Sequence, residues 1–217
     1  MGMNVIKSQS GRSMIEMLGV LAIIGVLSVG GLVGYSKAME RYRVNETINQ
    51  ISHIVTNTRD LFKTQPNLYG AMSFTDTISM STSTFANRIL ADKAKLFPTS
   101  LVKNGYKNLF DGGVNFYASG RFSNNDGKAF MLAFSYIPQE ACIELATRDW
   151  QSSLGLVAIS IVSTSGYNIK ATYLGNCTTK YKQGGALVCA KDMPMTIEQA
   201  TMACNTEKAS TIYWKFY

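Results

Sequence analysis

The chain is 217 residues long, which is enough for one domain with an appendage. Hydrophobic residues make up 46 % of it and charged residues only 16 %, and this low charged fraction argues against a purely soluble protein. The formal net charge is +7, but the basic residues are scattered rather than gathered in a run. They are interpreted as a solvated face, and no specific nucleic-acid partner is predicted.

The deficit of charge is local to a stretch near the N-terminus. Residues 17–36 contain no charge and are rich in Leu, Val and Ile. At ~1.5 Å per residue such a helix reaches about 30 Å, enough to cross the hydrocarbon core of a bilayer. A short polar leader, residues 1–11, precedes the stretch and no small-residue cleavage site follows it, which reverses the order of an ordinary signal peptide. We therefore expect the apolar segment to be retained as a transmembrane helix.

One carboxylate, Glu16, lies inside the apolar run, between Ile15 and Met17. A charge near the bilayer interior costs at least ~2.5 kcal/mol, so an intramembrane Glu usually has a partner. Taken alone, the residue fits two interpretations, a carboxylate that snorkels at the membrane edge and one that pairs with a functional partner.

The stretch QSGRSMIEMLGVLAIIGVL resembles the processing motif of type IV prepilins, in which a polar leader ends in Gly and is followed by four residues, a Glu and an apolar helix. The resemblance implies cleavage after Gly11 by a prepilin peptidase and N-methylation of Arg12, although this family usually has an apolar residue at the position of Arg12. It also implies that Glu16, the fifth residue of the cleaved chain, pairs with the α-amino group of a neighbouring subunit during assembly. Loss of Lys7 with the leader would leave a net charge of +6.

Beyond the apolar run the helical period continues, and one helix is predicted over residues 12–64. Its first half, 12–36, is apolar on all sides, and its second half, 37–64, is amphipathic. The expected apolar stripe of the second half consists of Val44, Ile48, Ile51, Ile54, Val55, Leu61 and Phe62. The expected solvent face consists of Arg41, Arg43, Glu46, Asn49 and Arg59. The lone histidine, His53, is interpreted as a packing residue rather than a ligand or base.

Residues 67–217 are predicted to form a globular domain of the α+β class, with a mainly antiparallel sheet packed on the second half of the long helix. Its first part, 67–98, is interpreted as a connecting region with a short helix at 85–96 that stops at Pro98. Strands are expected at 114–118, 129–137, 154–162 and 210–216, and helices at 138–150 and 196–204. Gly184 and Gly185 are expected to break a loop.

Four cysteines, Cys142, Cys177, Cys189 and Cys204, follow the apolar segment. Their spacings of 34, 11 and 14 residues include no CxxC motif and no nearby histidine pair, so no metal site is predicted. An even number of cysteines after an export signal favours two disulfides and an oxidising compartment. Spacing alone leaves three pairings open.

The domain is similar to type IVb pilins, the group of the toxin-coregulated and PilS-like pilins. This resemblance depends on the stretch SYIPQEACIEL and on the late Cys204 followed by TIYWKFY. It implies pairing of Cys142 with Cys204, which leaves Cys177 and Cys189 for a second, shorter loop.

The sequence contains no phosphate loop, no GxSxG, no HExxH and no pair of carboxylates whose spacing suggests acid–base chemistry. We therefore expect neither an enzyme nor a cofactor.

The function that the resemblance implies is a structural subunit of a type IV pilus. The chain would be held in the bacterial inner membrane by a single span with its domain in the periplasm, and would then polymerise with other copies into an extracellular filament for adhesion, aggregation or conjugation. Its partners would be the prepilin peptidase, the inner-membrane assembly machinery and a host or cell surface. Two alternatives stand beside this one: a type II secretion pseudopilin, and a membrane-anchored periplasmic protein whose match at Gly11 and Glu16 is accidental.

Overall fold

The structure, a computed structural model, describes residues 14–64, 78–79, 93–118, 129–162, 177–204 and 209–216. The chain divides into two compact units, residues 1–41 and 42–217. Helix α1, Met14–Thr64, supplies the described part of the first unit and the beginning of the second. A single long helix was expected here, and over the described residues it runs without a break.

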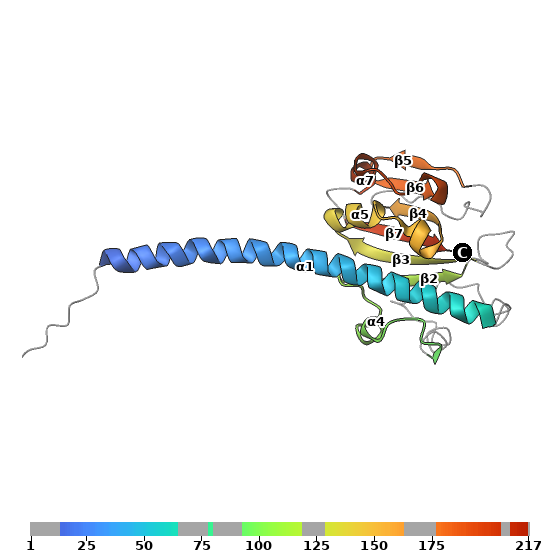
Figure 1. The fold of residues 1–217 in the computed structure, drawn as a ribbon, viewed down its shortest axis with the longest axis horizontal. Helices are drawn as coiled ribbons and strands as arrows, with labels where there is room; N and C mark the ends of the chain where they lie inside the picture. The colour runs from blue at the N-terminus through green and yellow to red at the C-terminus, as the bar shows by residue number, and fades with distance from the viewer. Residues whose placement is uncertain are drawn as a thin grey trace, which may run out of the picture. The chain divides into compact units, whose positions relative to one another are not determined.

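The second unit contains one seven-stranded sheet in the order β1-β2-β3-β7-β4-β6-β5 (Figure 1). Every neighbouring pair of these strands is antiparallel. The strands are β1 (Ile78–Ser79), β2 (Val114–Ala118), β3 (Phe130–Ile137), β4 (Leu156–Val162), β5 (Lys180–Lys182), β6 (Gly185–Cys189) and β7 (Ser210–Phe216). The predicted α+β class with a mainly antiparallel sheet is therefore confirmed.

The last strand of the chain, β7, lies in the middle of the sheet between β3 and β4. Trp214 is opposite Leu132 on one side and Ile159 on the other. Because successive strand residues point to opposite faces, Ile212, Trp214 and Phe216 share one face, and all three are fully buried. This face forms the main hydrophobic core of the domain.

The second half of α1 packs its apolar stripe into that core. Val44, Ile51, Ile54 and Val55 are fully buried in the same cluster as the core-facing residues of the sheet. This part of the predicted stripe is confirmed. Arg59 was expected on the solvent face, but it is half-buried and its Nη2 donates to the carbonyl oxygen of Leu154 at 2.6 Å.

Four further α-helices are described: α4 (Thr99–Lys103), α5 (Gln139–Ala146), α6 (Trp150–Leu154) and α7 (Ile197–Ala203). In Figure 1, α5 and α6 and the cyan part of α1 lie over the sheet.

The prediction of one helix over 138–150 is wrong, because Asp149 begins a second helix there. Its carboxylate accepts from the backbone N–H groups of Gln151 and Ser152, both at 3.1 Å, and hydrogen bonds from Ser152 lower the pKa of Asp149.

Two neighbouring expectations are corrected for related reasons. The strand expected from residue 154 begins at Leu156, since Leu154 completes α6 and Gly155 ends it in the left-handed conformation, at φ +56°. The glycine pair at 184–185 lies in a tight hairpin between β5 and β6, two strands that the sequence analysis did not predict.

The connecting region differs from its prediction where it is described. Most of the helix expected at 85–96 lies outside the described residues. Pro98 does not end a helix in the structure, but instead precedes α4 as its N-cap residue.

The turn before β2 gives a prediction about Gly112. A Cβ atom added to Gly112 would lie 1.8 Å from the carbonyl oxygen of Ser135, a clash with backbone. We expect Gly112→Ala to lower the free energy of unfolding by about 3 kcal/mol, since the strands must move apart to admit a methyl group. Denaturant unfolding of the full chain in detergent, followed by tryptophan fluorescence, measures this change.

The matched control is Gly105→Ala. Gly105 has φ +66° but open space around its Cβ position, so only the left-handed conformation opposes the substitution, at about 1–2 kcal/mol. Equal losses in the two variants would show that close packing at Gly112 is not what requires glycine there.

Candidate assembly surface

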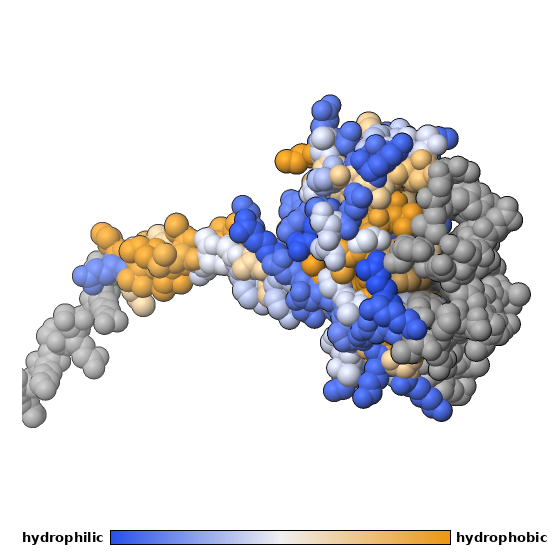
Figure 2. Space-filling view, turned by 45° about the vertical axis from the view of Figure 1, so that its right-hand side comes forward, coloured by the Kyte–Doolittle hydropathy of each residue, from blue (hydrophilic) through white to orange (hydrophobic). Residues whose placement is uncertain are grey.

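The described part of the first unit is a helix whose large apolar side chains are mostly exposed. From Met14 to Tyr35 every large hydrophobic residue is between 53 and 84 % exposed. Figure 2 shows this stretch of α1 as an orange, hydrophobic surface. Its most apolar window has a mean hydropathy of 2.3, and by length and composition the helix can cross a membrane. Such a surface is stable only when lipid or other protein covers it.

The polar side chains on this surface are compatible with an apolar environment. Ser28 Oγ donates to the carbonyl oxygen of Ile24 at 2.7 Å, and Ser36 Oγ donates to that of Leu32 at 2.9 Å. Both hydroxyls are therefore satisfied within the helix and require no water.

Glu16 is the exception. It is exposed in the first turn of α1, and no described residue forms an ion pair or hydrogen bond with it. The other two residues of the predicted processing site, Gly11 and Arg12, lie outside the described residues. Among the described residues Glu16 thus has no partner, and it lies at the N-terminal end of the apolar half of α1.

Glycines allow close approach to this helix. A Cβ atom added to any of five glycines on this stretch would have no atom within 4 Å, apart from the local atoms of the helix itself. These are Gly19, Gly25, Gly30, Gly31 and Gly34. In apolar surroundings, small residues let the backbones of neighbouring helices come close. The spacing of these glycines around α1 suits packing against several other helices.

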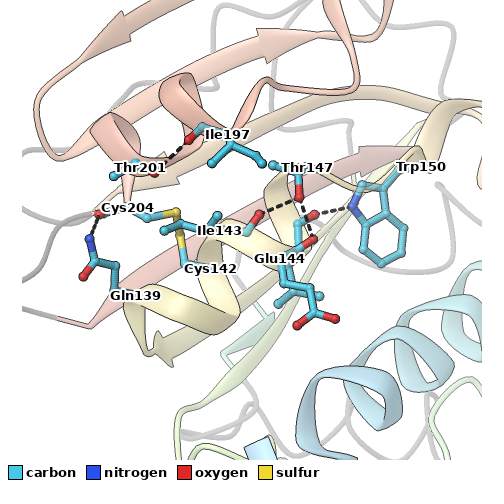
Figure 3. Close-up of a disulfide and its surroundings, with 10 residues drawn as sticks. Gln139, Cys142, Ile143, Glu144, Thr147, Trp150, Ile197, Thr201 and Cys204 are labelled. Atoms are coloured by element: carbon cyan, nitrogen blue, oxygen red, sulfur yellow. Dashed lines mark hydrogen bonds between the residues drawn. A yellow bond between two sulfur atoms is a disulfide. The ribbon is translucent and has the colours of Figure 1, made fainter. Parts of the chain in front are cut away.

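The globular unit contains two disulfides. Cys142 on α5 is bonded to Cys204 at the C-terminal end of α7, with a Cα–Cα distance of 5.9 Å (Figure 3). Cys177 is bonded to Cys189 at the end of β6, with a Cα–Cα distance of 5.8 Å. This is the pairing that the resemblance to type IVb pilins implies. Spacing alone could not have selected it.

The two disulfides have different surroundings. Cys142 and Cys204 are fully buried, and Gln139 Nε2 donates to the carbonyl oxygen of Cys204 at 3.2 Å.

In the second disulfide, Cys177 is half-buried. Next to it the hydroxyl of Thr179 accepts from the N–H of Cys189 at 3.1 Å and donates to the carboxylate of Asp192. Burial, with a smaller contribution from the Asp192 carboxylate, raises the pKa of Tyr181.

A groove of about 910 Å³ lies between the second half of α1 and the segment that contains α4. Exposed His53 lies on its wall, and Asn57 Nδ2 is 3.2 Å from His53 Nδ1 and donates to the carbonyl oxygen of Lys95 at 2.8 Å. Asn57 is thus within hydrogen-bonding distance of the histidine ring and links it to the segment that contains Lys95. Within the described ranges no group of His, Cys, Asp and Glu side chains could hold a metal ion. Sequence reasoning missed this groove because its second wall comes from residues 94–103, which begin in the expected connecting region, 67–98, and end in a segment for which no element was expected.

A sequence model of one protein family, described as PilS N terminal, matches residues 41–216. The match covers most of the chain and shows that it is a type IV pilin, of the type IVb group. The chain belongs to the PilS family.

Among solved structures the chain is similar to TcpA, a type IV pilin from the El Tor biotype of Vibrio cholerae. The sequence identity is 16 % and the TM-score is 0.46, over 79 % of this chain and 99 % of that one. No curated protein matches the chain.

The two disulfides differ in the stability they are expected to contribute. They close separations of 62 and 12 residues, and the loop-entropy relation assigns them about 4 and about 3 kcal/mol respectively. We expect Cys142→Ala with Cys204→Ala to destabilise the domain more than Cys177→Ala with Cys189→Ala does. Denaturant unfolding of both double variants measures the difference. A larger loss in the second variant would mean that local contacts of the β5–β6 hairpin outweigh chain entropy.

Proposed function

We propose that this pilin is made as a membrane-inserted precursor, cut after Gly11 and polymerised through its N-terminal helix into an extracellular filament. The observation that carries the proposal is the exposed apolar half of α1, with Glu16 in its first turn and no partner for this carboxylate among the described residues. Lipid covers this surface before assembly, and neighbouring helices cover it in the filament. The leader, 1–11, is the removed part, 12–36 is the membrane and assembly segment, 37–64 is the amphipathic half of the helix, and 67–217 is the pilin domain.

Glu16 sets the register of subunit addition in this proposal. Among apolar helices an unpaired carboxylate is costly, and a positively charged partner removes most of that cost. The α-amino group of Arg12, exposed by cleavage and methylated, supplies the positive charge from the neighbouring subunit. A subunit added out of register would leave both charges without a partner in a low-dielectric core.

The location and partners follow from the same scheme. Lys7 keeps the leader on the cytoplasmic side of the inner membrane, and the disulfide-bonded domain lies in the oxidising periplasm. A prepilin peptidase cuts the leader, and the inner-membrane assembly machinery extracts the subunit into the polymer. The exposed surface of the filament then serves adhesion, aggregation or conjugation. The family match supports a pilus subunit over a pseudopilin. Because the match begins at residue 41, it does not include the processing motif, which the next two experiments test.

The cleavage step is tested on protein isolated from membranes of a cell that carries a prepilin peptidase. We expect the intact mass and N-terminal sequence to show a chain that begins at Arg12, with or without one added methyl group. A chain that keeps residues 1–11 would contradict the processing step. The same chain expressed in a strain without the peptidase is the control, and it should keep its leader.

The role of Glu16 is tested by Glu16→Ala. The variant should be cleaved normally but yield at least about tenfold fewer sheared filaments, since loss of one member of an apolar ion pair strands the other charge. Quantitative blotting of sheared and membrane fractions measures both steps. Glu140→Ala, which removes an exposed carboxylate from α5, is the matched control and should assemble normally. Normal piliation by Glu16→Ala would disprove the ion pair.

A further inference from the structure

Tyr136, near the end of β3, departs from the pattern of its strand. Phe130, Leu132 and Phe134 alternate toward the core and are buried. Tyr136 is next in that alternation, yet it is 68 % exposed, while Ile137 is fully buried in the core cluster. The register of β3 against β7 shifts between Phe134 and Ile137, and Tyr136 has φ +60°. The irregularity therefore turns a large aromatic ring from the core to the surface.

Hydrogen bonds from the neighbouring segment hold this outward turn in place. The buried side chain of Asn108 donates from Nδ2 to the carbonyl oxygen of Ser135 at 2.7 Å, and its Oδ1 accepts from the N–H of Gly112 at 3.0 Å. The N–H of Ser135 donates to the carbonyl oxygen of Gly113 at 3.1 Å. A positive φ is uncommon for a bulky residue, and it persists only where the surrounding structure fixes the backbone. A ring presented on an ordered backbone loses little conformational entropy when it binds.

Tyr136 lies at the end of the second unit at which α1 enters it. The first residue of β3, the last of β7 and the first of β4 are opposite one another, so β3 and β4 begin at the same end of the sheet. Arg59 of α1 donates to the carbonyl oxygen of Leu154, just before β4, and so lies at that end. Tyr42 is about 25 Å back along the helix from Arg59, toward the opposite end, where β3 stops. In Figure 1 the arrow of β3 points along α1 toward its earlier residues.

Tyr42 continues the apolar surface of the N-terminal half of α1. It is 57 % exposed, and it and Tyr136 are two of the four exposed large hydrophobics among the described residues of the second unit; the other two lie on α7. The exposed apolar stretch ends with Tyr35, and Tyr42 follows two helical turns later, about 10 Å along the axis. When the apolar half spans a bilayer, Tyr42 therefore lies within about 10 Å of the hydrocarbon core, next to the headgroup layer.

The charges around the two tyrosines cancel. In α1 from residue 37 to 46 and in the segments 104–113 and 135–140, the basic residues are Lys37, Arg41, Arg43 and Lys107, and the acidic ones are Glu40, Glu46, Asp111 and Glu140. This surface thus lacks the excess of positive charge that attracts anionic lipid. Tyrosine, by contrast, is enriched at membrane–water interfaces, because its ring is apolar and its hydroxyl stays in contact with water.

We propose that Tyr42 and Tyr136 place their rings in the headgroup region of the bilayer that holds the apolar half of α1, so that this end of the domain rests on the membrane before assembly. The inference rests on the proposed function, because that function places the apolar half in a bilayer. A weak contact suffices, since the span keeps the domain at the membrane and its effective concentration there is high. A weak contact also lets the domain leave the membrane when the subunit joins the filament.

Quenching by lipid tests the contact at position 136. The full chain with Tyr136→Trp is reconstituted into vesicles of phosphatidylcholine brominated near the carboxyl end of its acyl chains, and into unbrominated vesicles. Trp150 and Trp214 are fully buried, so the wild-type chain supplies the background emission. We expect bromine to lower the added emission at least about twofold, because the new ring keeps the interfacial preference of tyrosine. The matched control, Lys63→Trp, changes an exposed residue about 30 Å further along α1 than Tyr42 and should not be quenched.

Lipid composition and vesicle flotation separate the possible outcomes. Quenching should be unchanged when about a third of the lipid is phosphatidylglycerol, since the charges at this end cancel. Quenching that requires phosphatidylglycerol, or no quenching at position 136, overturns the proposal. If the chain does not float with the vesicles at all, the proposed function fails as well. If it floats and position 136 stays unquenched, the function stands and the contact falls.

A photoactivatable lipid gives a second test, which needs no substitution in the chain. The wild-type chain is reconstituted with a phosphatidylcholine that carries a diazirine in its headgroup, irradiated and digested. We expect lipid adducts on the peptide that contains Tyr136 and none on the peptide that contains Lys63. Adducts that are confined to the peptides of α1 would overturn the proposal.

Discussion

The N-terminal half of helix α1 is too apolar to remain in water. The way the domain folds and the way the chain is proposed to assemble both depend on that constraint. Burying one Leu, Ile or Val side chain is worth about 1.5–3 kcal/mol, and α1 leaves such side chains exposed along its whole length from Met14 to Val33. No other described part of the chain covers them. The domain must therefore fold without using this segment, and the segment must always have lipid or other helices around it. The internal bonds of Ser28 and Ser36 fit this demand, and only Glu16 does not. A carboxylate placed where everything else is apolar has a physical rationale when a second chain supplies its partner.

The second half of the same helix meets a different demand with a different pattern. One face carries Val44, Ile51 and Val55 into the core of the domain, and the two buried threonines beside them are satisfied within the helix. Thr47 and Thr58 each donate to the carbonyl oxygen four residues earlier, at 2.8 and 2.6 Å. Their burial therefore leaves no unpaired hydroxyl. One continuous helix thus belongs to the core of the domain along half of its length and leaves the rest exposed, for lipid or, in the proposed filament, for other chains.

The sequence predicted those parts of the structure that local patterns determine. Strands β2 and β7 begin and end where alternating apolar residues placed them, because strict alternation on a half-buried sheet leaves little choice of boundary. The break between α5 and α6 was missed because Asp149 competes as a cap inside an otherwise helical pattern. Strand β5 was missed because a three-residue edge strand with two lysines has no apolar signature. The groove was out of reach for a different reason, since its walls are separated by about 38 residues in sequence, as in the Asn57–Lys95 hydrogen bond.

The disulfides connect the stability of the domain to its proposed use outside the cell. Central strand β7 begins six residues after Cys204, and the bond from Cys204 to Cys142 ties the chain just before this last strand to α5. The same bond fixes the C-terminal end of α7 to α5. A single covalent link therefore stabilises the fold by limiting the unfolded chain, and it ties the segment that leads toward the central strand to the helices beside the sheet.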